Sequence, residues 1–253
     1  MNTKLMISMM TVMMAMGAFA IKGTVATEVE RFSGDIKWHG RDKTYVVEQG
    51  KITKEYKLAD IVNLDIPKPA GYDKAVQMVE SGNGVAAIAT LTKIVADYKM
   101  LIWDKPAGRY LALAYIASGN AQKAYAACMP IISDDKTAAW KGDLAAAYWQ
   151  VLLKLGKRDQ LEGYLKKAIS SGDRRASAAA LVMRGDIIVA GSNDAPEELK
   201  RALRDGYLRV CLMYQDAECA AERAEALQKA AQCFDKLGQS SRAENLRTQL
   251  KAL

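Results

Sequence analysis

The chain has 253 residues, of which 50% are hydrophobic and 26% are charged, and its formal net charge is +7 at pH 7. This composition excludes a disordered or fibrous protein and allows one or two domains with a buried core. Basic pairs such as Lys166/Lys167 and Arg174/Arg175 are interspersed with acids, without a run of five or six like charges. We therefore expect a solvated surface, with a functional basic patch as the alternative.

The N-terminus has the features of a secretory signal peptide. Lys4 is followed by the apolar, Met-rich segment Leu5 to Met16 and by Ala18, Phe19 and Ala20, an A-x-A cleavage pattern. Residues 1–20 are therefore predicted to be removed, and the mature protein to be periplasmic or extracellular. Retention of the segment as an anchor is the alternative. No later segment is predicted to form a stable membrane span.

Residues 29–66 are predicted to form a small β module. Phe32, Gly34, Ile36 and Trp38 alternate with polar residues, and three further short β-rich runs follow at 45–47, 52–58 and 61–66. The segment 67–71 contains two prolines and ends the module, because proline cannot donate to a sheet.

These runs resemble the small Sm-like or Src-homology-like barrel modules found at the front of some exported bacterial proteins. The resemblance depends on three groups of residues: Gly34, Ile36 and Trp38; Tyr45 to Val47; and Leu58, Ile61 and Leu64. Cytoplasmic relatives of such barrels bind RNA, which an exported chain would rarely meet. We therefore expect a structural or interaction role here, and no nucleic-acid partner.

Residues 72–253 have a repeated pattern of apolar helical stretches that end in glycine. The glycines are Gly82, Gly119, Gly156, Gly191 and Gly238, at intervals of 37, 37, 35 and 47 residues. A glycine in the left-handed conformation closes a helix and lets the chain turn back. The pattern therefore predicts one helical hairpin for each glycine, in a mainly α solenoid.

The residues around Gly119 resemble the tetratricopeptide repeat family. Leu111, Ala112 and Tyr115 precede this glycine at helical spacing, and Ala124 follows it where a small residue lets two helices approach. The resemblance implies an α-solenoid that binds protein or peptide partners, although related helical-hairpin solenoids remain an alternative.

Later repeats depart from the family pattern. Trp149 and Leu161 occupy positions that are small in the family. Asp194 to Glu197 has the form of a capping box with proline in the first turn. The long last interval predicts longer helices between Leu203 and Leu227.

No arrangement of residues favours catalysis, a metal or a cofactor. The sole histidine, His39, stands in a predicted turn, which leaves no histidine-based metal cluster or catalytic triad. Asp134 and Asp135 are expected to cap a helix or a turn. Phosphate-binding glycine patterns are absent from the sequence. We expect a protein that is not an enzyme, with one using carboxylates alone as an alternative.

Four cysteines lie in the predicted mature chain. Cys211 and Cys219 flank a predicted turn between helices and are a candidate disulfide, because an oxidising compartment would permit one. Cys128 falls on an apolar helical stripe and is expected in the core.

In the tetratricopeptide family, the first helices of successive repeats line a concave groove that holds peptides. The resemblance, carried over by register from the glycines, implies a groove formed by Arg109, Leu113, Ile116, Gln150, Leu153 and Lys154. We expect an exported scaffold or adaptor that holds an extended or acidic segment of another envelope or secreted protein. The alternative is a binder of anionic glycan or cell-wall polymer.

Overall fold

The computed structural model describes residues 20–253, and the chain divides into two compact units after Ile66. The predicted signal peptide therefore lies outside the described residues, except for Ala20. Residues up to Ile66 form a β unit, and Pro67–Leu253 forms a helical unit. Each unit is described by itself.

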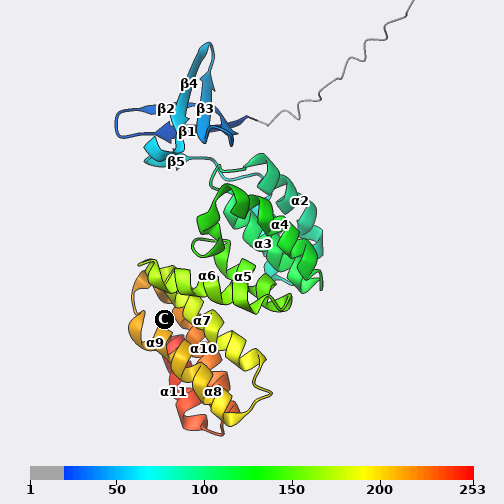
Figure 1. Ribbon diagram of the computed structural model, residues 1–253, viewed down its shortest axis with the longest axis vertical. Helices are drawn as coiled ribbons and strands as arrows, with labels where there is room; N and C mark the ends of the chain where they lie inside the picture. The colour runs from blue at the N-terminus through cyan, green and yellow to red at the C-terminus, as the bar shows by residue number, and fades with distance from the viewer. Residues whose placement is uncertain (1–19) are drawn as a thin grey trace, which may run out of the picture. The chain divides into compact units, whose positions relative to one another are not determined.

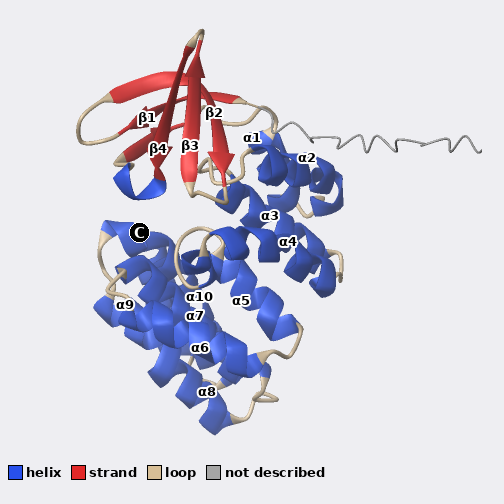
Figure 2. Ribbon diagram, turned by 45° about the horizontal axis from the view of Figure 1, so that its top comes forward, coloured by secondary structure: helices blue, strands red, loops and turns tan. Residues whose placement is uncertain are grey.

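The β unit is one antiparallel sheet of five strands in the order β4-β3-β2-β1-β5 (Figure 2). The strands are β1 (Ile21–Ala26), β2 (Arg31–His39), β3 (Thr44–Gln49), β4 (Ile52–Lys57) and β5 (Asn63–Asp65), and the short 3-10 helix η1 (Leu58–Asp60) precedes β5. Alternation along the strands buries one face, with Val25, Ile36 and Val47 fully buried.

The sheet differs from the prediction at both ends. Strand β1, which pairs with β2 over its whole length, lies before the predicted module. Its Gly23 allows Ile66 to lie close, because a Cβ there would stand 2.5 Å from the Ile66 side chain. The predicted strand at 61–66 is reduced to the three residues of β5, because only these pair with β1. The helix η1 replaces the end of the predicted run at 52–58.

The helical unit runs from α1 to α11 in chain order (Figure 1). Its helices are α1 (Tyr72–Glu80), α2 (Gly84–Asp97), α3 (Asp104–Ala117), α4 (Ala121–Asp134), η2 (Lys136–Ala139), α5 (Ala145–Lys154), α6 (Arg158–Ser170), α7 (Arg174–Ala190), α8 (Pro196–Ala202), the π-helical turn η3 (Leu203–Tyr207), α9 (Leu208–Met213), η4 (Ala217–Cys219), α10 (Ala220–Lys236) and α11 (Ser240–Lys251). None of the helices among residues 20–253 combines the length and the apolar character needed to span a membrane.

The helices pair into five hairpins, which confirms the predicted fold class of a solenoid of tetratricopeptide-like hairpins. Gly82, Gly119, Gly156 and Gly238 join the two helices of their hairpins in the left-handed conformation, with φ between 67° and 84°. Small residues beside these turns are buried, among them Ala124 and Ala243.

The fourth hairpin is built differently, and two predictions about it are wrong. Gly191 has φ −101°, and the left-handed residues of this turn are instead Asn193 and Asp194. The expected capping box does not form, since α8 begins after Ala195 without a side-chain cap. Asp194 forms an ion pair with Lys236 of α10 instead.

The second half of the fourth hairpin is a single helical stretch, α8-η3-α9, with a π turn in its middle. Gly185 of α7 and Gly206 of η3 meet where the two segments cross, and a Cβ on Gly206 would lie 2.8 Å from the Gly185 Cα. The longer helices expected in this region are present as this stretch and as α10, which has 17 residues.

The first helices of the hairpins form one continuous layer. In this layer α1 contacts α3, α3 contacts α5, α5 contacts α7, and α7 contacts α10. The second helices make few contacts with one another. The solenoid therefore curves, with the first helices on its inner side and the second helices spread apart on its outer side.

All four cysteines are buried free thiols. The candidate disulfide between Cys211 and Cys219 is not formed in this structure, where both are free thiols in the core of the last two hairpins. Cys128 lies in the core of the preceding hairpins, as predicted. Burial raises the pKa of the Cys128 thiol to about 12.

Candidate functional site

The inner layer of first helices carries two hollows along the same three helices, α5, α7 and α10. The first hollow, about 140 Å³, lies near the beginnings of these helices and is also lined by Arg109 of α3. The second hollow, about 300 Å³, lies one to three turns further along and is lined by Leu153, Asp186 and Lys229 among others. Together they mark a surface that follows the inner side of the solenoid.

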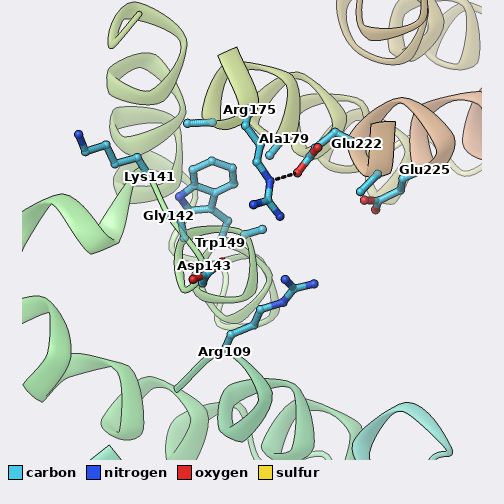
Figure 3. Close-up of a pocket in the computed structure, with 13 residues that line it drawn as sticks. Arg109, Lys141, Gly142, Asp143, Trp149, Arg175, Ala179, Glu222 and Glu225 are labelled. Carbon is cyan, nitrogen blue, oxygen red and sulfur yellow. Dashed lines mark hydrogen bonds and ion pairs between the residues drawn. The ribbon is translucent and has the colours of Figure 1, made fainter. Parts of the chain in front are cut away.

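Charged side chains from three helices face the first hollow (Figure 3). The guanidinium groups of Arg109 and Arg175 point into the same open space, whereas Lys141 extends away from it. Trp149 forms part of the wall, held in place because its Nε1–H donates to the Ala139 carbonyl at 2.9 Å. Trp149 is fully buried and supports the hollow from behind, and two cationic groups face its open space.

One of these cations is paired and the other is not. Arg175 donates Nε–H to Glu222 Oε1 at 2.9 Å, across from α7 to α10, and this bond raises the pKa of Arg175. Its terminal Nη atoms bond to no acceptor in the described chain. Arg109 lies 5.4 Å from the ring centre of Tyr110 and forms no ion pair with any residue of 20–253. Both guanidinium groups thus keep donors for a ligand.

Glu222 offers an acceptor in the same hollow. Its side chain is only 12% exposed, and its Oε2 is buried without a hydrogen-bond donor from the described residues. A buried carboxylate oxygen without a donor is costly. The first hollow therefore presents unsatisfied donors and an unsatisfied acceptor side by side.

The second hollow holds a polar cluster that is already satisfied. Asp186 accepts from the Tyr207 hydroxyl at 2.8 Å and from Lys229 at 2.6 Å, and Lys229 also pairs with Glu225. Burial raises the pKa of Asp186, and its two donors oppose this rise. Burial would lower the pKa of Lys229, but Asp186 outweighs it and raises that pKa. These bonds tie α7, η3 and α10 together.

Two of the six predicted groove residues line the hollows. Arg109 lines the first hollow and Leu153 the second. Leu113 and Ile116 are half-buried and pack against the core beneath the surface, and Gln150 is also half-buried. Lys154 is exposed at the last turn of α5 and lines neither hollow.

The prediction missed Arg175, Glu222 and Asp186. Arg175 and Glu222 lie in the first turns of α7 and α10, which have 17 residues each, whereas α3 has 14, so these turns extend beyond the register set by the glycines. Asp186 lies in the second half of α7. The local sequence signal for Arg175 and Glu222 was a charged residue in the first turn of a long helix, and the signal for Asp186 was a charged residue beside the apolar run Ile187–Ala190. The Arg175–Glu222 bond joins residues 47 positions apart and appears only in the folded chain.

Other polar groups considered in the sequence have structural roles. Asp135 caps η2 by accepting from the Thr137 amide at 2.9 Å, as expected, and Asp134 pairs with Lys99. His39, which was predicted in a turn, is instead the last residue of β2, directly before the turn, and is exposed.

One acidic cluster lies outside the two hollows. The ligand atoms of Asp216, Glu218 and Cys219 lie within 4.8 Å of one another. Arg174 already forms ion pairs with both carboxylates of this group.

A comparison with solved structures finds similarity to a variant of a chain described as a kinesin light chain of Podosopora anserina with nearly identical TPR-like repeats. The superposition has a TM-score of 0.42 and 16% sequence identity, and covers 71% of this chain and 91% of that chain. No family model and no curated protein matches. Because this structural likeness is low, the fold assignment rests on the five hairpins themselves.

Proposed function

We propose that the helical unit is a scaffold that holds an extended segment of a protein partner along its inner surface. The observation that carries this proposal is the first hollow, where Arg109 and Arg175 keep free donors and Glu222 keeps a free buried acceptor. An extended peptide presents main-chain N–H and C=O groups together and satisfies both kinds of site. The half-buried Leu153, which lines the second hollow, would hold one of its apolar side chains.

The charges of the first hollow favour a segment that carries an acidic residue. Arg175 is paired with Glu222, and Glu225 is paired with Lys229. Within the described chain, Arg109 and Asp143 are the lining residues left without an ion pair near the open space of the hollow, and of these two the Arg109 guanidinium points into that space. Arginine binds carboxylates with two parallel hydrogen bonds. An aspartate or glutamate of the partner is therefore the expected anchor.

The glycan alternative fits this surface less well. A polyanion needs a stretch of cations without acids between them, whereas Asp143, Glu222 and Glu225 stand among the cations of the hollow. The carboxylates also give no support to an enzyme, because each of the two Glu side chains is used in an ion pair.

Export of the protein is part of the proposal and has a direct test. The mature N-terminus, sequenced from protein isolated by cell fractionation, is expected to begin at Ile21 in the periplasmic or extracellular fraction. Recovery of the intact N-terminus in the cytoplasmic fraction would contradict export. The β unit is proposed as an interaction or support module of the exported chain, with the small-barrel resemblance as its basis.

Site-specific crosslinking tests where a partner segment lies. A photoreactive amino acid replaces Ala179, which lines the first hollow, and a control replaces Gln122, which is exposed on α4. Peptides selected from a random library on the purified protein are then irradiated with each variant. We expect crosslinks at position 179 alone; equal crosslinking at position 122 would contradict the assigned surface.

A further inference from the structure

The outer side of the solenoid contains a groove of about 410 Å³ between α2 and α4, with α3 as its floor. We call it the α2–α4 groove. Its lining is largely apolar and includes Val95, Leu111, Ala127 and Ile131. The groove exists because the second helices of the first two hairpins diverge while their first helices stay in contact. Its volume lies within the range of small-molecule sites.

A buried carboxyl group lines this apolar groove. Asp104, the first residue of α3, is only 2% exposed. Its Oδ2 accepts from the Met100 amide at 2.9 Å and so fixes the turn before α3. Its Oδ1 is buried and has no hydrogen-bond partner in the described part of the chain. The Met100 amide therefore satisfies one carboxylate oxygen. The amides of Asp104 and Lys105 also oppose the rise in the pKa of this carboxyl group, but the other oxygen has no donor at hydrogen-bond geometry among the described residues.

The other polar groups of the groove limit the charge of its ligand. Lys99 and Asp134 form an ion pair at 2.9 Å and balance each other. With Lys123 and Asp104 as the other charged residues of the lining, the groove carries two basic and two acidic side chains and so no surplus negative charge that would favour a cation. A neutral donor such as an N–H group satisfies Oδ1 without the desolvation cost of an ammonium ion.

The groove favours an aromatic body for that ligand. Tyr115 contributes a ring to the lining, and aromatic rings pack well against one another in offset or edge-on arrangements. Lys99 and Lys123 also line the groove, and an ammonium group that lies over the face of an aromatic ring attracts it. We propose that the α2–α4 groove binds a small aromatic molecule with one N–H donor, of the indole type, whose N–H donates to Asp104 Oδ1.

This site is independent of the proposed peptide surface, because it lies on the outer side and shares no lining residue with either hollow. A result that contradicts one proposal therefore does not contradict the other.

Two probes of nearly equal shape test the role of the donor. Indole and benzofuran differ by the N–H group, which benzofuran replaces with an oxygen acceptor. Each is titrated into the purified, isotope-labelled protein and followed by amide chemical shifts. We expect saturable shifts around α2 and α4 with indole, and a dissociation constant at least about tenfold higher for benzofuran, since a site built for a hydrogen bond rejects the analogue that lacks it.

Two variants connect the binding to the groove. Asp104→Asn keeps an oxygen for the Met100 amide and places a donor where Oδ1 stood, so the preference for indole is expected to disappear or to reverse. Ala126→Trp fills the groove from an exposed position and is expected to weaken indole binding at least about tenfold. The thermal unfolding of each variant is measured as a check of folding, and Ala126→Trp decides the outcome if Asp104→Asn does not fold.

Equal affinity for the two probes would overturn the proposal, as would unchanged indole binding by Ala126→Trp. The absence of saturable shifts up to the solubility limit of indole would also overturn it.

Discussion

Gly206 and Gly185 lie back to back at the crossing of η3 and α7, and a Cβ on Gly206 would stand 2.8 Å from both the Cα and the amide nitrogen of Gly185. This approach brings Tyr207 over Gly185 and its hydroxyl to Asp186. The π turn therefore sets the geometry of the polar cluster in the second hollow, in keeping with the frequent place of such turns at functional sites.

Gly206→Ala is expected to destabilise the protein by about 2 kcal/mol or more, because the clash is with backbone atoms that cannot move aside. Gly163→Ala on α6 is the matched control. Nothing lies within 4 Å of a Cβ there, and alanine is expected to stabilise the helix by about 0.5–1 kcal/mol. Urea unfolding of both variants measures the difference, and a neutral Gly206→Ala would refute the close crossing.

Gly119→Ala and Gly191→Ala distinguish the two kinds of turn. Gly119 has φ 77°, where alanine costs about 1–2 kcal/mol, whereas Gly191 has φ −101°, where alanine is expected to change stability by less than about 0.5 kcal/mol. The free energy of unfolding of each variant gives the comparison. Equal losses of stability in the two variants would mean that the fourth turn also needs a left-handed glycine.

These turns show how far the sequence determines the fold. Four glycines were correctly predicted to join hairpins, because the left-handed conformation is a local requirement that glycine meets best. The Gly191 prediction failed because asparagine and aspartate also adopt that conformation, as Asn193 and Asp194 do. Strand β1 was missed because its identity as a strand depends on pairing with β2 rather than on its own alternation.

The candidate site was also predictable only in part, because some of its residues come together only through tertiary contacts. Counting back from Gly119 and Gly156 places Arg109 and Leu153 on the inner surface. The count works because each residue lies on a helix that ends just before a left-handed glycine. Arg175 and Glu222 come from longer helices that the repeat pattern does not describe. Asp104 Oδ1 lies without a donor from the described residues in a site lined by three helices. No local sequence pattern predicts such a tertiary arrangement.

The stability of the protein is expected to depend on Asp104 in a pH-dependent way. Burial raises the pKa of Asp104 above its ordinary value of 3.8, and the Met100 hydrogen bond opposes this rise. Between 3.8 and the raised pKa, the folded state holds more protons than the unfolded state. The contribution of Asp104 to stability therefore falls as pH rises through this window and is level above it.

The measurement is the free energy of unfolding of the native sequence minus that of Asp104→Asn, taken by urea titration between about pH 3.5 and pH 7. We expect this difference to decrease with pH and then to level off. A difference that grows with pH would mean that the folded protein lowers the pKa of Asp104.

The four thiols are expected to be protected in the folded protein. Burial raises the pKa of Cys128 to about 12 and of Cys211 to about 11, and also raises the pKa of Cys219 and of Cys233. A thiol reagent at neutral pH should therefore react slowly with native protein and count four thiols after unfolding without reductant. A count of two would show that a disulfide forms.

The central claim is that Arg109 on the inner surface holds an acidic residue of an extended partner segment. The most direct measurement is the fluorescence anisotropy of a labelled acidic peptide, taken from the random-library selection, with the native protein, Arg109→Glu and the control Lys166→Glu. Lys166 is an exposed residue of α6, a second helix, so its reversal makes the same charge change away from the inner surface. The account predicts at least about tenfold weaker binding for Arg109→Glu and less than about twofold for Lys166→Glu. Equal weakening by the two reversals, or none by Arg109→Glu, would contradict it.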